Sequence, residues 1–181
     1  MNGNMLIGII ACIFAADQCF AAKAQANISV TASITQKCKI STTDVDFGIY
    51  DPVIVNLASA LNAAVPGTLS VSCSKITSGL TLELSMGVNS AGGSARRMRD
   101  MGRDSQYLNY QLFQPSSATP GAACAYAAIW GDGSNGTAFV PTGARWGTGL
   151  SQSFNVCGQI APNQQVMPGV YADVVIATVK F

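Results

Sequence analysis

The chain has 181 residues, enough for one domain with a sizeable core. Charged residues make up 10% of the sequence, the formal net charge is +1, and histidine is absent. This balance argues against binding to nucleic acid or to an anionic membrane, and the missing histidines remove the commonest catalytic triads and zinc sites. We therefore expect no catalytic residue, no metal and no cofactor.

The first 26 residues predict a secretory signal peptide. Residues 5–16 form an apolar stretch that is too short to span a bilayer as a stable anchor. Two overlapping A-x-A cleavage motifs lie between Ala21 and Ala26, and we favour cleavage after Ala26. A lipoprotein cleavage box at residues 9–12 is a weaker alternative, because it would leave an unusually short apolar stretch.

Two of the six cysteines, Cys12 and Cys19, would leave with the signal peptide. The even number that remains in an exported protein indicates two disulfides. Four cysteines allow three connectivities, which the residues alone do not distinguish. A metal site is a weaker alternative, because the sequence has no C-x-x-C pair and no histidine. The remaining cysteines are Cys38, Cys73, Cys124 and Cys157.

Residues 27–36 (NISVTASITQ) alternate strictly between apolar and polar side chains, which is typical of a β-strand with one buried face. The strand could belong to its own domain, or it could be a detachable strand that serves another subunit. The pattern does not separate these interpretations. Its apolar positions are Ile28, Val30, Ala32 and Ile34.

The next segments carry mixed signals. Residues 38–47 are polar and turn-bearing, and residues 53–64 start with three β-branched side chains, from which we predict a strand and then an irregular loop. Residues 68–73 and 80–88 alternate as two strands. The first would bury Leu69, Val71 and Cys73, and the second Leu80, Leu82, Leu84 and Met86.

The only basic cluster, residues 96–104 (RRMRDMGRD), predicts a solvated loop or strand edge rather than a polyanion site, because two aspartates interleave with its arginines. Residues 107–113 and 125–130 predict further strands. Residues 131–136 (GDGSNG) predict a turn; a calcium loop is less favoured because carboxylates are few and the closing glutamate is missing.

Residues 168–181 (PGVYADVVIATVKF) open with a Pro-Gly turn signal and are then rich in β-branched and aromatic side chains. A run that is apolar on both faces predicts a strand inside a sheet, covered by an earlier segment or by another molecule. Short strands at about ten-residue intervals, with Gly and Pro between them and no convincing helix, predict an all-β sandwich.

Several short motifs occur in a characteristic order. They are Arg97-Met98, LNYQLF at 108–113, IWGDG at 129–133, CGQI at 157–160, GVYAD at 169–173 and the final VKF. Together with the cysteine positions they resemble the spore coat protein U-like domain family, the pilin domain of archaic chaperone–usher pili. The resemblance covers residues 28–181.

The resemblance implies an incomplete immunoglobulin-like β-sandwich that a donor strand from another subunit or from a chaperone completes by β-augmentation. Residues 27–36 would be the N-terminal donor-strand segment, with Ile28, Val30, Ala32 and Ile34 as donor positions, and residues 37–181 the pilin domain. The acceptor and chaperone-docking strand would carry Tyr171, Val175, Val179 and Phe181. The implied disulfides are Cys38–Cys73 and Cys124–Cys157.

The function that the resemblance implies is a structural subunit, shaft or adaptor, of a secreted pilus that supports adhesion and biofilm formation. Its partners would be a periplasmic pilus chaperone, an outer-membrane usher and neighbouring pilin subunits, with export through the periplasm to the cell surface. An adhesive tip domain of the same kind of fibre is the alternative, less favoured because such tip subunits usually carry an extra domain in place of a donor segment.

An enzyme is the least favoured class of function. Glu83 is the only glutamate, and no pair of carboxylates lies within a recognisable catalytic motif. Asp44 and Asp46 are two residues apart, but solvation explains them better than acid–base chemistry.

Overall fold

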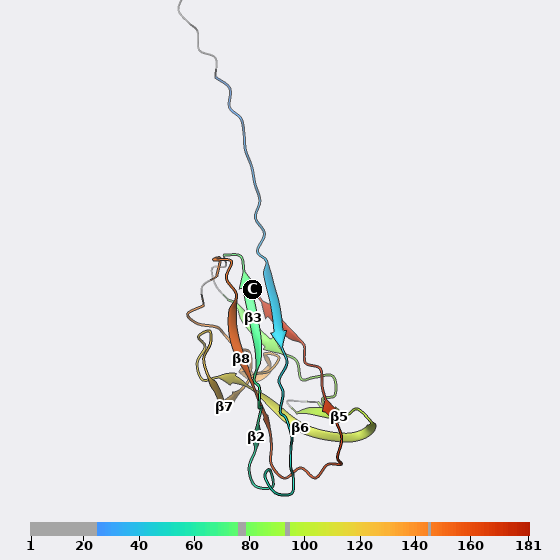
Figure 1. Cartoon of the computed structure of the whole chain (residues 1–181). Coiled ribbons are helices and arrows are strands. Elements are labelled where there is room, and N and C mark those ends of the chain that lie inside the picture. Colours follow the sequence, from blue (N-terminus) through green and yellow to red (C-terminus); the bar gives the residue numbers. More distant parts are fainter. Residues whose placement is uncertain (1–24, 76–78, 93–94, 145) are drawn as a thin grey trace, which may run out of the picture. The chain divides into compact units, whose positions relative to one another are not determined.

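The computed structural model describes residues 25–75, 79–92, 95–144 and 146–181, and it divides the chain into two units, Met1–Ile34 and Thr35–Phe181. Most of the predicted signal peptide lies outside the described residues. The described part of the first unit, residues 25–34, has no strand assignment, and its side chains are exposed. The strands and the single short 3-10 helix among the described residues belong to the second unit (Figure 1).

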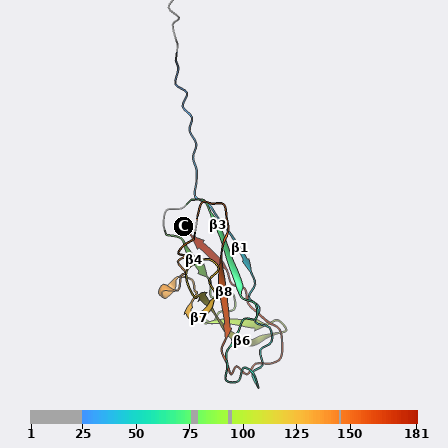
Figure 2. The same cartoon turned by 60° about the vertical axis from the view of Figure 1, so that its left-hand side comes forward.

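The regular secondary structure of the second unit consists of antiparallel strands and one short 3-10 helix among the described residues (Figures 1 and 2). Their bounds are β1 Cys38–Thr43, β2 Leu61–Asn62, β3 Gly67–Cys73, β4 Thr81–Leu84, β5 Arg96–Asp100, β6 Arg103–Pro115, β7 Cys124–Ile129, β8 Gln152–Ile160, β9 Tyr171–Ala172 and β10 Ala177–Lys180, with the 3-10 helix η1 at Ser134–Gly136.

The strands form two sheets. The larger sheet has the order β1-β3-β8-β6-β5-β9, with β2 also paired to β8 and β7 to β6. The smaller sheet contains β4 and β10, paired from Ala177 opposite Leu84 to Lys180 opposite Thr81. The all-β sandwich predicted from the strand spacing is therefore confirmed.

One apolar core joins residues from both sheets. Leu69 and Val71 of β3 are fully buried, as is Leu82 of β4, so the alternation read from these two strands is confirmed. Ring contacts link the core aromatics, with centroid distances of 4.8 Å between Trp130 and Phe139 and 5.3 Å between Phe139 and Phe154. These contacts hold the loop after η1 against the sheet.

Two stretches near the start of the second unit differ from the prediction. Residues 38–43, which looked polar and turn-bearing, form the edge strand β1, because Cys38 and Ile40 pack on the core while the polar positions face solvent. The β-branched run 53–55, predicted as a strand, lies in turns with exposed side chains. Asp51 accounts for this difference, because its carboxylate accepts hydrogen bonds from the backbone N–H groups of Val53 and Ile54.

The prediction of a solvated loop or strand edge at residues 96–104 was wrong for Arg96 and Asp100, whereas Asp104 is exposed. Arg96 and Asp100 are buried, at 0% and 2% exposure, because residues 96–100 form β5, which lies between β6 and β9 and alternates inward and outward. The Arg96 guanidinium donates to the carbonyl oxygens of Leu84, Ser85 and Trp130. The cluster is therefore part of the framework that positions β4.

The C-terminal segment also differs from the single inner strand that its composition predicts. It forms two short strands, β9 paired with β5 and β10 paired with β4, and each lies at a rim among the described residues. Its side chains alternate, so that Val175 and Val179 are half-buried while Val174 and Ile176 are exposed. The apolar outer face is thus left uncovered in the isolated chain.

Within the described ranges, no helix is long and apolar enough to span a membrane. The same ranges hold no group of three or more His, Cys, Asp or Glu side chains that could bind a metal ion.

Candidate functional site

β1 and β10 are among the strands of the second unit that have a single ladder partner within the described residues. β1 pairs with β3, and β10 pairs with β4, but the remaining edge of each strand forms no ladder. Unpaired edges present rows of backbone N–H and C=O groups that can bind another strand. The site of interest is the space between these two edges.

A groove of about 490 Å³ lies between the two edges. One wall is the end of β1 and the residues after it, and the other wall is the segment from β9 to the start of β10. The floor comes from inward-facing residues of both sheets, mostly aliphatic. The wall residues are Thr42, Thr43, Asp44, Val45, Phe47, Tyr171, Ala172, Asp173, Val174, Val175 and Ala177, and the floor includes Leu69, Leu84, Met98, Tyr110, Leu112 and Val156.

The first wall is seated closely on β8. A Cβ atom at Gly158 of β8 would lie 2.7 Å from side-chain carbons of both Val45 and Phe47, so only a glycine lets this wall approach. The Phe47 ring packs edge-on against Tyr110 on the floor, with centroids 5.9 Å apart. Asp46 and Val65 exchange two backbone hydrogen bonds of 3.0 Å, which hold the wall from its outer side.

The second wall is held to β4 and its extension by backbone hydrogen bonds. Ser85 N–H donates to the Ile176 carbonyl at 2.9 Å, and Val88 N–H donates to the Val174 carbonyl at 3.0 Å. In an antiparallel ladder the backbone groups of successive residues point alternately to the two sides. The N–H and C=O groups of Val175 and Ala177 therefore point away from β4, towards the groove.

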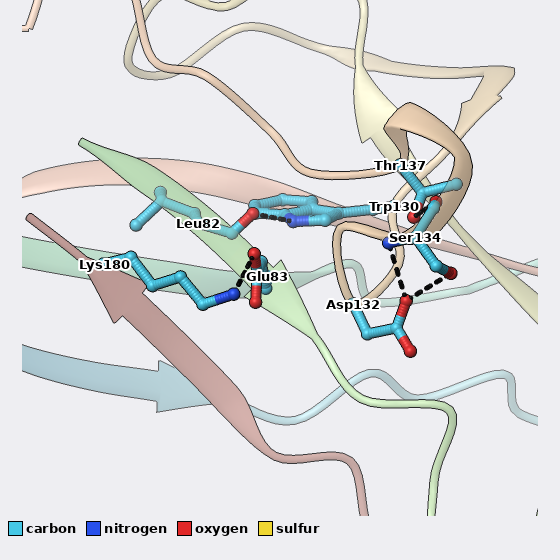
Figure 3. A network of polar contacts seen from close by, with 7 residues as sticks. All are labelled: Leu82, Glu83, Trp130, Asp132, Ser134, Thr137 and Lys180. Atoms are coloured by element: carbon cyan, nitrogen blue, oxygen red, sulfur yellow. Dashed lines mark hydrogen bonds and ion pairs between the residues drawn. The ribbon is translucent and has the colours of Figure 1, made fainter. Parts of the chain in front are cut away.

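β4 itself is anchored on both sides, as Figure 3 shows. Lys180 of β10 forms an ion pair with Glu83 at 2.6 Å, and the Trp130 indole N–H donates to the Leu82 carbonyl at 2.9 Å. In the turn that follows Trp130, the Asp132 carboxylate accepts hydrogen bonds from the backbone N–H and the hydroxyl of Ser134. These bonds lower the pKa of Asp132. The turn predicted at residues 131–136 is thus explained by side-chain capping.

A polar cluster lies at the β9 end of the groove. The Tyr110 hydroxyl donates to the Asp173 carboxylate at 2.7 Å, and burial, followed by this bond, raises the pKa of Tyr110. Asn89 donates to the same carboxylate from its backbone at 3.1 Å and from its side chain at 3.0 Å. Gly87 makes room for it, because a Cβ atom there would lie 1.8 Å from Asp173 Oδ2.

The structure separates the residues predicted for the acceptor strand. Tyr171 and Val175 line the groove, whereas Val179 is half-buried against the core outside the lining and Phe181 is 51% exposed. No local sequence pattern selects Val45, Met98 or Tyr110 as groove residues, because they lie far apart along the chain and meet only in the folded sandwich.

The residues predicted as donor positions lie in the first unit and are exposed. Ile28, Val30 and Ile34 are each at least 87% exposed, which is unusual for aliphatic side chains in an alternating pattern. Ala32 between them is also exposed.

Two disulfides are present in the second unit. Cys38–Cys73 joins opposite residues of β1 and β3, and Cys124–Cys157 joins β7 to β8. The first one ties down the strand that forms the beginning of the groove wall.

Comparisons with known proteins agree with this architecture. The family model of the Spore Coat Protein U domain matches residues 24–178. Protein U of Myxococcus xanthus is 32% identical over 171 residues, which cover 89% of this chain and 87% of that protein.

Among solved structures, the chain is similar to the CsuC-CsuE chaperone-tip adhesion subunit pre-assembly complex from the archaic chaperone-usher Csu pili of Acinetobacter baumannii. The match has a TM-score of 0.51 and 19% identity, and it covers 82% of this chain but 40% of the matched chain. The chain thus spans less than half the length of that neighbour. The fold is the incomplete immunoglobulin-like sandwich of pilus subunits, and the chain belongs to the Spore Coat Protein U domain family.

Proposed function

We propose that the protein is a structural subunit of a chaperone–usher pilus and that its groove accepts a donor strand from another molecule. The observation that carries the proposal is the pair of unpaired strand edges on the two sides of an apolar groove. The same chain carries an exposed segment of alternating apolar residues that forms no strand of its own among the described residues.

The lengths of the donor and acceptor segments match. The apolar donor positions span residues 28–34, and the second groove wall spans residues 171–177, which is seven residues in each case. At about 3.3 Å per residue both extend over roughly 20 Å. Ile28, Val30, Ala32 and Ile34 could therefore all face the floor when the segment lies along this wall.

The energy available from donor insertion is large relative to the stability of a domain. Burying three or four apolar side chains contributes roughly 1.5–3 kcal/mol each, or about 5–12 kcal/mol in sum. Ladder hydrogen bonds to the two open edges add about 0.5–1.5 kcal/mol apiece. A domain of this size is stable by only about 5–15 kcal/mol, so completion of the sandwich would change its lifetime greatly.

The similarity to a tip adhesion subunit solved with its chaperone supports a periplasmic chaperone as the first occupant of the groove. In this proposal Tyr171, Val175, Val179 and Phe181 form the docking strand, an outer-membrane usher exchanges the chaperone for the next subunit, and the product is a cell-surface fibre. Because a donor-like segment precedes the sandwich unit, we place the protein in the shaft or as an adaptor of a fibre that supports adhesion and biofilm formation.

An adhesive tip domain is the second candidate. The observation that favours it is the solved neighbour, a complex that contains a tip adhesion subunit, although this chain spans 40% of the length of the matched chain. A tip domain would need the groove but not the donor segment, so the two candidates differ in what residues 28–34 do.

Deletion of residues 27–34 tests the proposal. The protein would be exported with its chaperone and usher, and samples would be run in detergent with and without boiling. We expect the full chain to give a ladder of assemblies that disappears on boiling, since a fitted strand unfolds slowly. The deletion should give only folded chaperone–subunit heterodimers.

Ile34→Asp should act like the deletion, because a charge in an apolar groove is costly unless it is paired. Ser33→Asp is the matched control, since Ser33 belongs to the opposite face of the same segment. A ladder that persists after the deletion would refute the donor role and favour the tip domain. Loss of the folded heterodimer would show that the segment belongs to its own domain.

A further inference from the structure

The residues that follow the first groove wall form an exposed apolar loop, which we call the apolar knuckle. Its side chains are between 50% and 90% exposed, although all are large aliphatic groups. Figure 1 shows this part of the chain at the lower end of the second unit, next to β2. The knuckle consists of Ile49, Val53, Ile54, Val55 and Leu57.

The knuckle is held rigidly. Asn56 is buried and bonds to Asp51 in both directions, with Asn56 N–H to the Asp51 carbonyl at 2.7 Å and Asp51 N–H to the Asn56 side chain at 3.0 Å. Asn163 N–H donates to the Asn56 carbonyl at 2.9 Å, and the Tyr50 hydroxyl donates to the Ala161 carbonyl at 3.0 Å. A preorganised loop loses little conformational entropy when another surface covers it.

The groove is open at the knuckle end and closed at the other. The lining stops at Thr42 on one wall and at Ala177, the first residue of β10, on the other, and β1 and β10 have Cα atoms within 8 Å of each other. Two strands that flank an inserted strand must lie about 9.5 Å apart, since neighbouring strands are about 4.8 Å apart. A donor strand therefore enters, and its link to its own subunit leaves, past Phe47 and Tyr171.

The link between donor segment and body is short. Residues 35–37 separate Ile34 from β1, so at no more than about 3.6 Å per residue the first residue of β1, Cys38, lies within about 14 Å of Ile34. The body of the donor subunit must then begin beside the open end of the groove. The knuckle begins at Ile49, two residues after the wall residue Phe47, and so lies at the same end.

We propose that the apolar knuckle packs against a second copy of this chain, on the pole from which residues 35–37 of that copy leave. This inference rests on the proposed function and adds a second contact between successive subunits. Hydrogen bonds from Gly147 N–H to the Cys73 carbonyl and from the Ser72 hydroxyl to the Gly149 carbonyl place residues 147–150 at that pole.

The pole offers an apolar counterpart to the knuckle. Leu150 is 68% exposed there, and Phe181 follows directly after β10; Figures 1 and 2 show the C-terminus near the end of the unit where β1 begins. Because the two surfaces differ, the contact is heterologous and repeats along a fibre instead of closing a dimer. The contact would restrict the angle between neighbouring subunits, which the short link of residues 35–37 does not restrict by itself.

The test is a photo-cross-linking residue in the assembled protein. The full chain is exported with its chaperone and usher, with p-benzoylphenylalanine at position 54. The control carries the same residue at position 101, since Met101 is 74% exposed in the turn between β5 and β6. We expect light-dependent dimers that survive boiling, at least tenfold more abundant from position 54, with the linked peptide from residues 35–39, 147–150 or 180–181.

The unboiled ladder separates failure of this inference from failure of the proposed function. If the ladder forms and position 54 gives no cross-link, or links elsewhere, the knuckle contact is refuted while donor insertion stands. If the ladder forms without a cross-link and Ile54→Asp reduces fibre binding to polystyrene, the knuckle binds external surfaces and the inference is also refuted. If the full chain forms no ladder, donor-strand insertion and the knuckle contact are both refuted.

Discussion

Residues 28–34 and residues 171–177 both predict strands from their composition but have different positions in the structure. The first segment alternates apolar and polar side chains, and the second is apolar on both faces. The first segment exposes its apolar side chains, whereas the second packs the half-buried Tyr171, Val175 and Ala177 against the core and hydrogen-bonds along β4 and β5. The first segment has no strand assignment, and the second has one edge without a ladder partner.

The difference shows that alternation specifies which face of a strand is apolar but not which edge is paired. Side-chain periodicity concerns the direction perpendicular to the sheet, while pairing occurs within the sheet. The two segments are therefore complementary: one has an apolar face and no ladder, and the other provides a ladder edge and an apolar floor.

The largest effect on stability is expected on the inward face of the C-terminal segment. Val175→Asp combined with Val179→Asp should lower the free energy of unfolding by about 2–5 kcal/mol, because both side chains pack on the core. The matched control is Val174→Asp with Ile176→Asp, whose side chains are exposed in the same segment. Urea unfolding of the purified chain measures both, and equal losses would contradict the alternation described here.

The second-largest loss of stability is expected from removal of the disulfide at the groove wall. Cys38→Ala with Cys73→Ala should cost about 3–4 kcal/mol, because the bridge closes a loop of 35 residues in the unfolded chain. Cys124→Ala with Cys157→Ala should cost a similar amount, since its separation is 33 residues. Hydrogen exchange distinguishes the two double variants, because only the loss of Cys38–Cys73 should expose the amides of β1 to exchange. Equal protection of the β1 amides in both variants would argue against the role of this disulfide in holding the groove wall.

A smaller, pH-dependent effect on the free energy of unfolding should come from Asp100, which is linked through Arg103 to the turn that starts the C-terminal segment. The Asp100 carboxylate accepts hydrogen bonds from Gly102 N–H and from Arg103, which also bonds to the Pro168 carbonyl. These contacts, the Gly102 bond first, lower the pKa of Asp100 in the folded state. Its contribution to stability is therefore present above the unfolded pKa of about 3.9 and is lost as the pH falls through the lower folded value.

Asp100→Asn should remove this dependence. Unfolding free energies at pH 5 and pH 2.5 would be compared, and the variant should lose less stability than the unmodified chain between these values. An identical loss in both proteins would mean that the acid sensitivity comes from other carboxylates.

The smallest effect is expected at the N-terminal segment. Ile34→Asp should change the free energy of unfolding of the isolated chain by less than about 0.5 kcal/mol, because this side chain is exposed. Thermal or urea unfolding measures the change. A loss as large as that of the Val175 and Val179 variant would remove the contrast between the two segments.

Much of the second unit could be predicted from local pattern. The alternation at residues 68–73 and 80–88 predicts two strands and their buried faces, and the structure forms β3 at Gly67–Cys73 and β4 at Thr81–Leu84. The Gly and Asn residues at 131–136 predict the turn that contains η1. β1 was missed because an edge strand with one half-buried face needs few apolar residues. Residues 53–55 were assigned to a strand because β-branched composition does not register the capping of their N–H groups by Asp51.

The sequence by itself determined the class of fold, the apolar face of the main strands and the presence of strand-like patterns at residues 27–36 and 168–181. These properties depend on neighbouring residues and on the two-residue period of a strand. Only the tertiary structure decided that Arg96 is buried, that Val45, Met98 and Tyr110 share one groove, and that β1 and β10 each keep a free edge. Those features depend on which distant strands pair, and strand pairing is set by the packing of the whole sandwich.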